Sequence, residues 1–469
     1  MESKPHRQLH IFFFPFMAQG HILPTIDMAK LFASRGVKAT LIMTPFNAAL
    51  FSNTIEGIKN LGIEIGVLII KFPSVEVGLP EGCENAQLTI TPEMQHKLFG
   101  AAALLEQPLE QLLQEHRPDC LVADTFFPWA TDIASKHGIP RLVFHGTGFF
   151  ALCASRCVLS YEPHKKVSSD SELFTIPTLP HEIKMTKQQL PDFITGNVET
   201  EFTKLYKASK EVESKSYGVI VNSFYELEPA YVDHYRNVLG TKSWHIGPVS
   251  LCNINTADKH DCLKWLDSKK PNSIVYVCFG SVANFNDAQL FEIALGLEAS
   301  GQEFIWVVRR EKDDEGREEW LPEGYEKRME GKGLIIRGWS PQVLILDHEA
   351  VGGFVTHCGW NSTLEGVSAG VPMVTWPVSA EQFYNEKLVT QILKIGVGVG
   401  AQRWAKLLGD SVKSDAIEKA VTRIMVGEEA KEIRSRAKVL GAMARSAVEE
   451  GGSSYSDLNA LIEELKTLG

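Results

Sequence analysis

Short apolar runs alternate with helical patterns along this chain, and the alternation limits the folds that it can adopt. The run 9–16 is followed by residues 22–36, where apolar residues from Ile22 to Ala33 recur at helical spacing, and then by the run 37–44. The runs are apolar at successive positions, which is typical of parallel strands with helices on both faces of the sheet. The sequence therefore predicts a doubly wound α/β fold.

Runs of the same kind continue along the chain and fall into two series. They occupy residues 120–124, 140–145, 218–224, 273–280, 303–310, 352–358 and 372–377. The chain has 469 residues, which exceeds the roughly 250–300 residues that one core usually holds. A polar stretch without regular periodicity separates the two series and predicts a linker. The expected division is a Rossmann-like domain at 1–248, a linker at 249–268, a second Rossmann-like domain at 269–450, and a helix at 451–469 that packs back on the first domain.

The composition argues against several classes of function. A net charge of −11 and a pI of about 5.8 disfavour a nucleic-acid-binding protein and a protein bound to an anionic membrane surface. The N-terminal apolar run is shorter than the core of a signal peptide, and no run approaches the roughly 18 residues of a membrane-spanning helix. The eight cysteines form no C-x-x-C pair and fit free thiols in a reducing compartment. We therefore expect a cytoplasmic protein without membrane insertion.

The segment 357–370, HCGWNSTLEGVSAG, offers three different chemistries. His357 and Cys358 are metal-ligand types, but neighbouring side chains diverge and no partner pair is evident, so we expect no metal site. Gly366 to Gly370 fits the G-x-S-x-G pattern of serine hydrolases, with Ser368 as the nucleophile. That motif needs a strand before the serine and a helix after it, whereas the order is reversed here.

The third chemistry is phosphate binding at the start of a helix. The run 352–358 ends in a glycine-containing turn, and a helix then opens at Asn361 or Ser362. Free N–H groups at such a position attract phosphate, and ligands of doubly wound sheets lie at the carboxyl ends of the strands. Ser362 and Glu365 also match a capping box, so plain helix capping remains an alternative.

A longer motif surrounds this segment. The 44 residues 339–382, from Trp339 to Gln382, closely resemble the plant secondary product glycosyltransferase box of plant UDP-dependent glycosyltransferases. The likeness covers essentially the whole chain. It includes PFMAQGHILP at 15–24, ADTFFPWA at 123–130, FHGTGFFA at 144–151 and VCFGS at 277–281.

The resemblance implies a fold and an activity. Members have the GT-B fold, in which two Rossmann-like domains with parallel sheets face a cleft, the first binding the acceptor and the second the UDP-sugar. The expected reaction is inverting transfer of glucose from UDP-glucose to a hydroxyl of a small lipophilic plant metabolite, such as a phenolic, flavonoid, terpenoid or hormone, to give a β-glucoside. We expect no cofactor and no metal, partners limited to the acceptor and the UDP-sugar, and a monomer.

The same resemblance assigns the donor site. Trp339 stacks on the uracil, and the backbone of Ser340 pairs with the base edge. The other assignments are Gln342 and Glu365 for the ribose, Ser281, His357, Asn361 and Ser362 for the diphosphate, and Trp360, Glu381, Gln382 and Thr147 for the sugar. The amide of Gln382 can donate and accept at once, and we expect it to favour glucose over galactose through the 4-hydroxyl.

Two residues at the carboxyl edge of the first predicted sheet are candidate catalytic groups. His21 lies in the turn after the first strand, and Asp124 ends the run 120–124. By position and resemblance, His21 is the general base and Asp124 accepts the proton on its other ring nitrogen. A structural histidine and a helix cap are the alternatives for these residues.

The acceptor site is less legible from the sequence. Phe16, Phe126 and Phe149 lie near the motif turns, and we expect them to line an apolar slot, with the protein core as the alternative.

Two other functions compete with glucosyl transfer. One is a nucleotide-sugar-binding protein without turnover, and the other is a serine hydrolase that uses Ser368.

Overall fold

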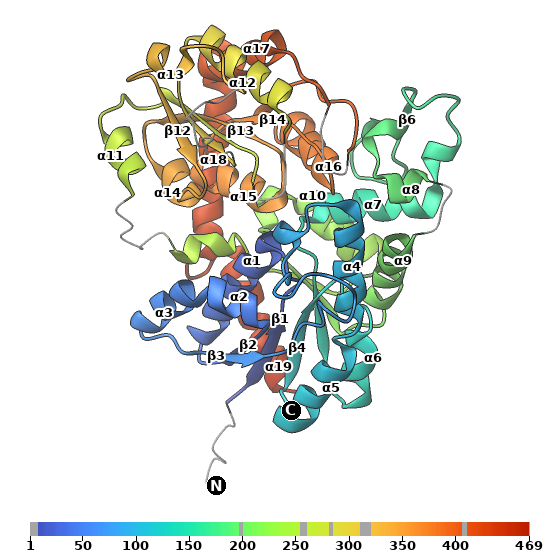
Figure 1. The fold of residues 1–469 in the computed structure, drawn as a ribbon. Coiled ribbons are helices and arrows are strands. Elements are labelled where there is room, and N and C mark those ends of the chain that lie inside the picture. The colour runs from blue at the N-terminus through green and yellow to red at the C-terminus, as the bar shows by residue number, and fades with distance from the viewer. Residues whose placement is uncertain are drawn as a thin grey trace.

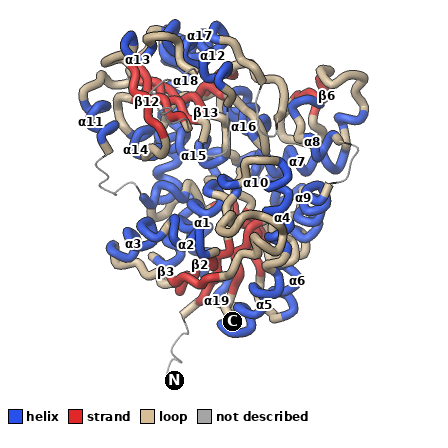
Figure 2. The backbone as a smooth tube through the Cα atoms, in the orientation of Figure 1, coloured by secondary structure: helices blue, strands red, loops and turns tan. Residues whose placement is uncertain are grey.

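The chain folds into two parallel sheets, each flanked by helices (Figure 1, Figure 2). The computed structural model describes residues 8–196, 200–253, 260–280, 285–309, 320–405 and 410–468. The first sheet has the order β3-β2-β1-β4-β5-β8-β9 and the second has the order β12-β11-β10-β13-β14-β15. Neighbouring strands in both sheets pair in parallel. The predicted doubly wound α/β fold is therefore confirmed.

The strands of the first sheet come from residues before position 246, and those of the second from residues after position 273. The first sheet comprises β1 (His10–Phe14), β2 (Lys38–Met43), β3 (Ile65–Ile69), β4 (Cys120–Asp124), β5 (Arg141–Phe144), β8 (Gly218–Val221) and β9 (Ser243–His245). The second comprises β10 (Ile274–Cys278), β11 (Glu303–Val308), β12 (Gly333–Arg337), β13 (Val351–Thr356), β14 (Met373–Thr375) and β15 (Gly396–Gly398). A small antiparallel hairpin joins β6 (Leu173–Thr175) to β7 (Lys184–Thr186).

Helices cover both sheets (Figure 2). Those before the linker are α1 (Gln19–Ala33), α2 (Pro45–Leu50), α3 (Ser52–Asn60), α4 (Pro92–Ala103), α5 (Glu106–His116), α6 (Ala130–Lys136), α7 (Phe149–Tyr161), α8 (Asp192–Thr195), α9 (Glu201–Glu213) and α10 (Pro229–Asp233). Those after it are α11 (Asp261–Asp267), α12 (Asp287–Ser300), α13 (Tyr325–Arg328), α14 (Gln342–Asp347), α15 (Trp360–Ala369), α16 (Gln382–Lys387), α17 (Ser414–Met425), α18 (Gly427–Val448) and α19 (Ser453–Lys466). No helix among these described residues is long and apolar enough to cross a membrane.

Strand β1 shows why the runs are apolar at successive positions. Ile11 and Phe13 lie in one buried cluster with residues of α1, whereas Phe12 and Phe14 lie in another with residues of α5. Side chains alternate between the two faces of a strand, so a strand covered on both faces needs apolar residues at every position. The sheet therefore carries two cores, one on each face.

The connection between the two sheets is partly helical. The 3₁₀ helix Val249–Asn253 and helix α11 lie in the stretch predicted to be an irregular linker, and residues 254–259 of that stretch lie outside the described residues. Helix α11 has two buried positions, Cys262 and Leu266, which the lack of a regular apolar pattern in this stretch did not predict.

The last helix returns to the first sheet (Figure 1). Leu458, Leu461, Ile462 and Leu465 of α19 are buried in the same cluster as Ile11. We propose the domain division 1–248, 249–268, 269–450 and 451–469. It is supported by the fact that each sheet takes its strands from one part of the chain, and by the packing of α19 on the first sheet.

Candidate active site

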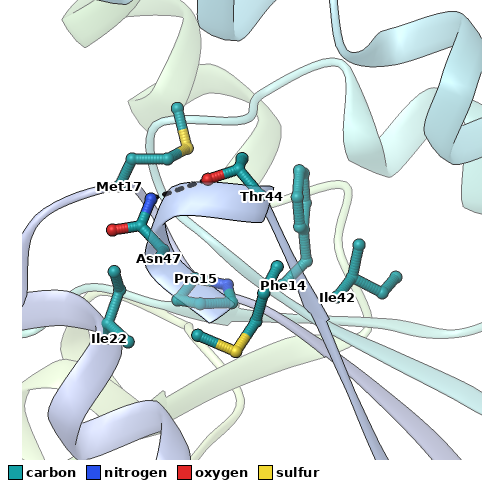
Figure 3. Close-up of a pocket in the computed structure, with 8 residues that line it drawn as sticks. Phe14, Pro15, Met17, Ile22, Ile42, Thr44 and Asn47 are labelled. Atoms are coloured by element: carbon teal, nitrogen blue, oxygen red, sulfur yellow. Dashed lines mark hydrogen bonds between the residues drawn. The ribbon is translucent and has the colours of Figure 1, made fainter. Parts of the chain in front are cut away.

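His21 lies in the first turn of helix α1 and not, as predicted, in the preceding turn, which comprises residues 15–18. Figure 3 shows a small, mainly apolar pocket that this turn shares with the end of β2, lined among others by Pro15, Met17 and Asn47. Asn47 donates through Nδ2 to Oγ1 of Thr44 at 2.7 Å, and the carbonyl of Met17 accepts from the backbone of Ala86 at 2.8 Å. The second of these hydrogen bonds ties Met17, two residues before α1, to the segment that contains Ala86.

His21 and Asp124 are in direct contact. Nδ1 of His21 lies 2.6 Å from Oδ2 of Asp124. The Asp124 side chain is fully buried, and its Oδ1 accepts a hydrogen bond of 3.0 Å from the backbone N–H of Phe126. Arg141 donates to the backbone carbonyl of Asp124 at 2.8 Å. A carboxylate can only accept hydrogen bonds, so the Nδ1 proton of His21 points at Asp124 and Nε2 is left as the basic nitrogen.

The surroundings tune the basicity of His21. Burial lowers the pKa of the imidazole, but the charge and the hydrogen bond of Asp124 more than offset this, so the pKa of His21 lies above its usual value of 6.5. The charge of Glu381, a residue of the second domain, also raises it. The arrangement therefore provides a strengthened base that the two domains share.

Helix α15 presents its N-terminus to the first domain. It begins at Trp360 after the N-cap Gly359, and no side chain caps it. The predicted helix start at Asn361 or Ser362 is therefore late by one or two residues. The capping box at Ser362 is also wrong, because Ser362 lies inside the first turn and its hydroxyl accepts from Nε2 of Gln342 at 3.0 Å. N–H groups at an uncapped helix start attract anions.

Asn361 links this helix to the first turn of α1 in the first domain. Its Nδ2 donates to the carbonyl of Gly20, next to His21, at 2.7 Å. Its Oδ1 is buried and has no hydrogen-bond partner in the described part of the chain. Asn361 thus connects the two domains beside the base, besides being a candidate ligand of the diphosphate.

The residues expected to bind the uracil ring and the ribose lie together. Trp339 is 63% exposed, so its ring face is available for stacking. Ser340 is buried, and its hydroxyl contacts the hydroxyl of Tyr276 at 3.0 Å. Gln342 donates to Oε2 of Glu365 at 2.6 Å. Burial, together with the charge of Asp27 from the first domain, raises the pKa of Glu365 to about 7, although the hydrogen bond from Gln342 lowers it.

His357 fits between two glycines. A Cβ at Gly280 would lie 2.6 Å from Cε1 of the imidazole, and a Cβ at Gly359 would overlap it as well. Burial lowers the pKa of His357 to about 4, so the ring is neutral at pH 7. Its Nδ1 is buried and has no partner among the described residues, which leaves it for a ligand atom. Ser281, which follows Gly280, lies outside the described residues.

Two residues predicted to bind the sugar use part of their polar groups elsewhere. The indole N–H of Trp360 donates to the carbonyl of Asn222 in the first domain at 2.7 Å, so this side chain joins the domains and offers no free N–H to a sugar. Oε1 of Gln382 accepts from the backbone N–H groups of Val378 and Ser379 at 2.8 and 2.9 Å. Gln382 therefore does not both donate and accept toward a sugar, and only its NH₂ group remains.

Two other sugar candidates keep free groups. The hydroxyl of Thr147 is buried and has no hydrogen-bond partner among the described residues. Glu381 accepts from Nδ2 of Asn385 at 3.2 Å, and burial raises the pKa of its carboxyl group. Both can accept from, or donate to, hydroxyl groups placed near His21.

Aromatic side chains surround His21 on the side of the first domain. Its ring centre lies 5.8 Å from that of Phe16 and 5.6 Å from that of Phe126. Phe149 packs elsewhere, since its ring centre lies 5.5 Å from that of Tyr235, and we do not assign it to the acceptor slot. The sequence reasoning missed the aromatic residues that continue the group, which lie on helices and loops without a motif. They are Phe99, Phe193, Phe202, Tyr206 and Trp404.

Ser368 has no features of a nucleophile. It is 3% exposed and its hydroxyl donates to the carbonyl of Leu364, four residues earlier in α15, at 2.7 Å. The hydrolase hypothesis therefore fails on geometry.

The described residues contain no group of three or more His, Cys, Asp or Glu that could hold a metal ion.

Two Rossmann-like domains, with a His–Asp pair on one and an uncapped helix N-terminus on the other, define a nucleotide-sugar-dependent glycosyltransferase of the GT-B fold. Residues 93–433 match the family described as UDP-glucoronosyl and UDP-glucosyl transferase. The chain belongs to this family. It is therefore a UDP-dependent glycosyltransferase, as the resemblance implied.

Curated and solved relatives agree with this assignment. The chain is 62% identical to UDP-glucose flavonoid 3-O-glucosyltransferase 7 of Fragaria ananassa, over 100% of this chain and 98% of that protein. It is 60% identical to scopoletin glucosyltransferase of Nicotiana tabacum, over 98% of each. The crystal structure of Glycyrrhiza uralensis UGT73P12, complexed with glycyrrhetinic acid 3-O-monoglucuronide, superimposes with a TM-score of 0.92 at 43% identity, over 98% of this chain and 96% of that one. Medicago truncatula UGT71G1, complexed with UDP-glucose, gives 0.80 at 26%, over 98% and 99%.

Proposed function

We propose that this enzyme transfers glucose from UDP-glucose to a hydroxyl of a small phenolic compound, with inversion at the anomeric carbon. The observation that carries the proposal is the His21–Asp124 pair, which lies beside the N-terminus of α15 from the second domain. The names of the relatives support the donor and the acceptor class, since they include a flavonoid and a scopoletin glucosyltransferase.

The reaction needs one proton acceptor and one anion site. Nε2 of His21 takes the proton of the acceptor hydroxyl as its oxygen bonds to the anomeric carbon, and the bond from that carbon to the β-phosphate oxygen breaks. The Asp124 carboxylate stabilises the imidazolium that forms. UDP leaves with the electron pair, and the N–H groups at the start of α15 stabilise the charge that develops on it. Family members invert because the hydroxyl attacks from the face opposite the leaving group.

The donor residues keep their expected roles, with two changes. We assign Trp339 and Ser340 to the base, Gln342 and Glu365 to the ribose, and Ser281, His357, Asn361 and Ser362 to the diphosphate. Glu381, Gln382 and Thr147 remain at the sugar. In the first change, Gln382 contributes only its NH₂ group. In the second, Trp360 acts through its backbone and its interdomain contact, because its indole is bound to Asn222.

Phe16 and Phe126 are proposed to form the acceptor wall next to the base. Both lie within 6 Å of the His21 ring, centre to centre. Flat aromatic acceptors gain from stacking against such side chains. We further propose a monomer that works in the cytosol, where the eight free cysteines would stay reduced.

The test is an assay of UDP release together with mass spectrometry of the product. UDP-glucose is offered with a flavonol, with scopoletin, and with no acceptor, and the anomeric configuration is read from the coupling constant of the anomeric proton. A β-glucoside that depends on the acceptor supports the proposal. Tight binding of UDP-glucose with no product from any acceptor would instead support a binding protein without turnover. An α-glucoside would refute the inverting mechanism.

A further inference from the structure

A strap from the second domain contacts both the first domain and the loop at residues 378–382, called here the sugar loop because it carries Glu381 and Gln382. The strap follows β15 and comprises residues 399–405. The backbone N–H of Trp404 donates to the carbonyl of Gln188 in the first domain at 2.8 Å, and that of Ala405 donates to the carbonyl of Val378 at 2.8 Å. The indole Nε1 of Trp404 donates to the carbonyl of Ala380 at 3.1 Å. One side chain therefore reaches the loop that ends in Glu381 and Gln382.

The sugar loop has a strained backbone at this contact. Ala380 has a φ of +49°, in the left-handed region that residues with a Cβ avoid. Such a conformation persists only when neighbouring contacts determine it. The Gln382 side chain binds the N–H groups of Val378 and Ser379 just before Ala380, and the Trp404 indole binds the Ala380 carbonyl. Glu381 follows directly, so the orientation of its carboxyl group depends on this backbone.

The ring of Trp404 also ends the line of aromatic residues that starts at the base. Its centre lies 6.2 Å from that of Phe193, with the two ring planes nearly perpendicular. From Phe193 the contacts continue through neighbouring ring pairs to the two residues beside His21. These pairs are Phe193–Phe202 at 5.0 Å, Phe202–Phe99 at 4.9 Å, Phe99–Phe16 at 5.2 Å and Phe99–Phe126 at 5.5 Å.

We propose that Trp404 is a positioning residue that orders the sugar loop and also borders the acceptor wall. Its indole N–H holds Ala380 in the conformation that directs Glu381 toward the sugar, and its ring closes the far end of the wall that receives a flat aromatic acceptor. The inference rests on the proposed function for the acceptor half only. The donor half depends on the hydrogen bond to Ala380 and can be tested without any acceptor.

The first experiment removes the N–H and keeps an aromatic ring. For Trp404→Phe we expect the dissociation constant of UDP-glucose to rise about two- to twelvefold, the range that the loss of one hydrogen bond gives, while that of UDP changes less than twofold. Isothermal titration calorimetry measures both constants. The KM of the acceptor should stay within twofold of wild type, because the ring remains against Phe193. Trp265→Phe, at a partly buried tryptophan of the linker outside the site, is the matched control.

Two further variants separate positioning from a general loss of structure. In the double variant Ala380→Gly, Trp404→Phe, glycine adopts a positive φ without strain, so we expect at least half of the lost UDP-glucose affinity to return. Phe193→Leu should raise the KM of the acceptor and leave the UDP-glucose constant unchanged. This variant still tests the wall if Trp404→Phe is unstable.

The outcomes are distinct. Equal weakening of UDP and UDP-glucose in Trp404→Phe, unchanged binding of both, or no rescue by Ala380→Gly would each overturn the positioning role. An unchanged acceptor KM in Phe193→Leu would overturn the claim that the acceptor wall extends to Phe193 and Trp404. If the wild-type enzyme glucosylates no phenolic acceptor, the proposed function fails, while the ratio of the UDP to the UDP-glucose constant still decides whether Trp404 orders the sugar loop.

Discussion

Replacing Asp124 with Asn should move the ring proton of His21 from Nδ1 to Nε2. The backbone N–H of Phe126 donates to Oδ1 of Asp124, and His21 Nδ1 lies at Oδ2. In Asp124→Asn the amide oxygen is needed by Phe126, so the amide NH₂ faces His21 Nδ1 and donates to it. The imidazole proton then moves to Nε2, the atom that must accept the proton of the acceptor hydroxyl.

The expected loss of kcat in Asp124→Asn has two causes. A hydrogen bond to a charged group contributes about 1.5–3 kcal/mol, which corresponds to roughly 10- to 150-fold in rate. Loss of the basic tautomer adds to this and brings the expected fall in kcat to roughly 10²–10⁴-fold. Asp124 also raises the pKa of His21, so the acid limb of the kcat/KM profile should move to lower pH in the variant.

The assay is steady-state UDP release across pH 5 to 9 with one good acceptor. Asp132→Asn, at an exposed aspartate in α6, is the matched control and should behave like wild type. Circular dichroism and thermal melting establish that the variant is folded. A folded Asp124→Asn enzyme that keeps more than a third of the wild-type kcat, or whose acid limb moves to higher pH, would refute the reasoning.

Three further outcomes are expected. His21→Ala should lower kcat by roughly 10²–10⁴-fold and leave the dissociation constant of UDP-glucose, measured by calorimetry, nearly unchanged. Glu365→Gln should raise the melting temperature at pH 8 more than at pH 5: burial raises the pKa of Glu365 from 4.5 to about 7, so ionisation of the wild-type carboxyl costs stability as the pH rises through this window. UDP-glucose should be used at least tenfold better than UDP-galactose by kcat/KM, because a misplaced 4-hydroxyl leaves the Gln382 NH₂ group unpaired, at a cost of about 1–3 kcal/mol; equal efficiency in a side-by-side assay would contradict this.

The proximity of His21 and Asp124 could be predicted from the sequence by position and family resemblance together. Asp124 ends β4, His21 lies in the first turn of the helix that follows β1, and these two strands pair in parallel, with Phe14 opposite Ala123. Adjacent parallel strands bring their carboxyl ends together, but position alone left a structural histidine and a helix cap as alternatives. Strands β3 and β12 gave weaker signals, since Val67 and Ile69 of the edge strand β3 are exposed and β12 is only partly buried.

The acceptor wall could not be predicted in the same way. Phe99, Phe193 and Phe202 lie in α4, α8 and α9, with Phe99 far from the other two in the chain, and nothing in their local sequence distinguishes a wall from a core. The contrast with Phe149 illustrates this. It lies next to a motif turn, yet it is the first residue of α7 and packs inward against Tyr235, because the direction of its side chain depends on where the helix begins.

The second domain shows a further limit of motif reading. Three polar groups in the 44-residue box could face a ligand, yet the protein already uses each of them: the indole of Trp360 binds Asn222, the amide of Asn361 binds Gly20, and the carbonyl of Gln382 binds its own loop. Two of these partners belong to the first domain, and Gly20 directly precedes His21. We therefore propose that Asn361 helps to set the separation between the helix proposed to hold the diphosphate and the residue proposed to take the proton. On this proposal, part of the box would act on the reaction by placing the two domains as well as by binding the donor.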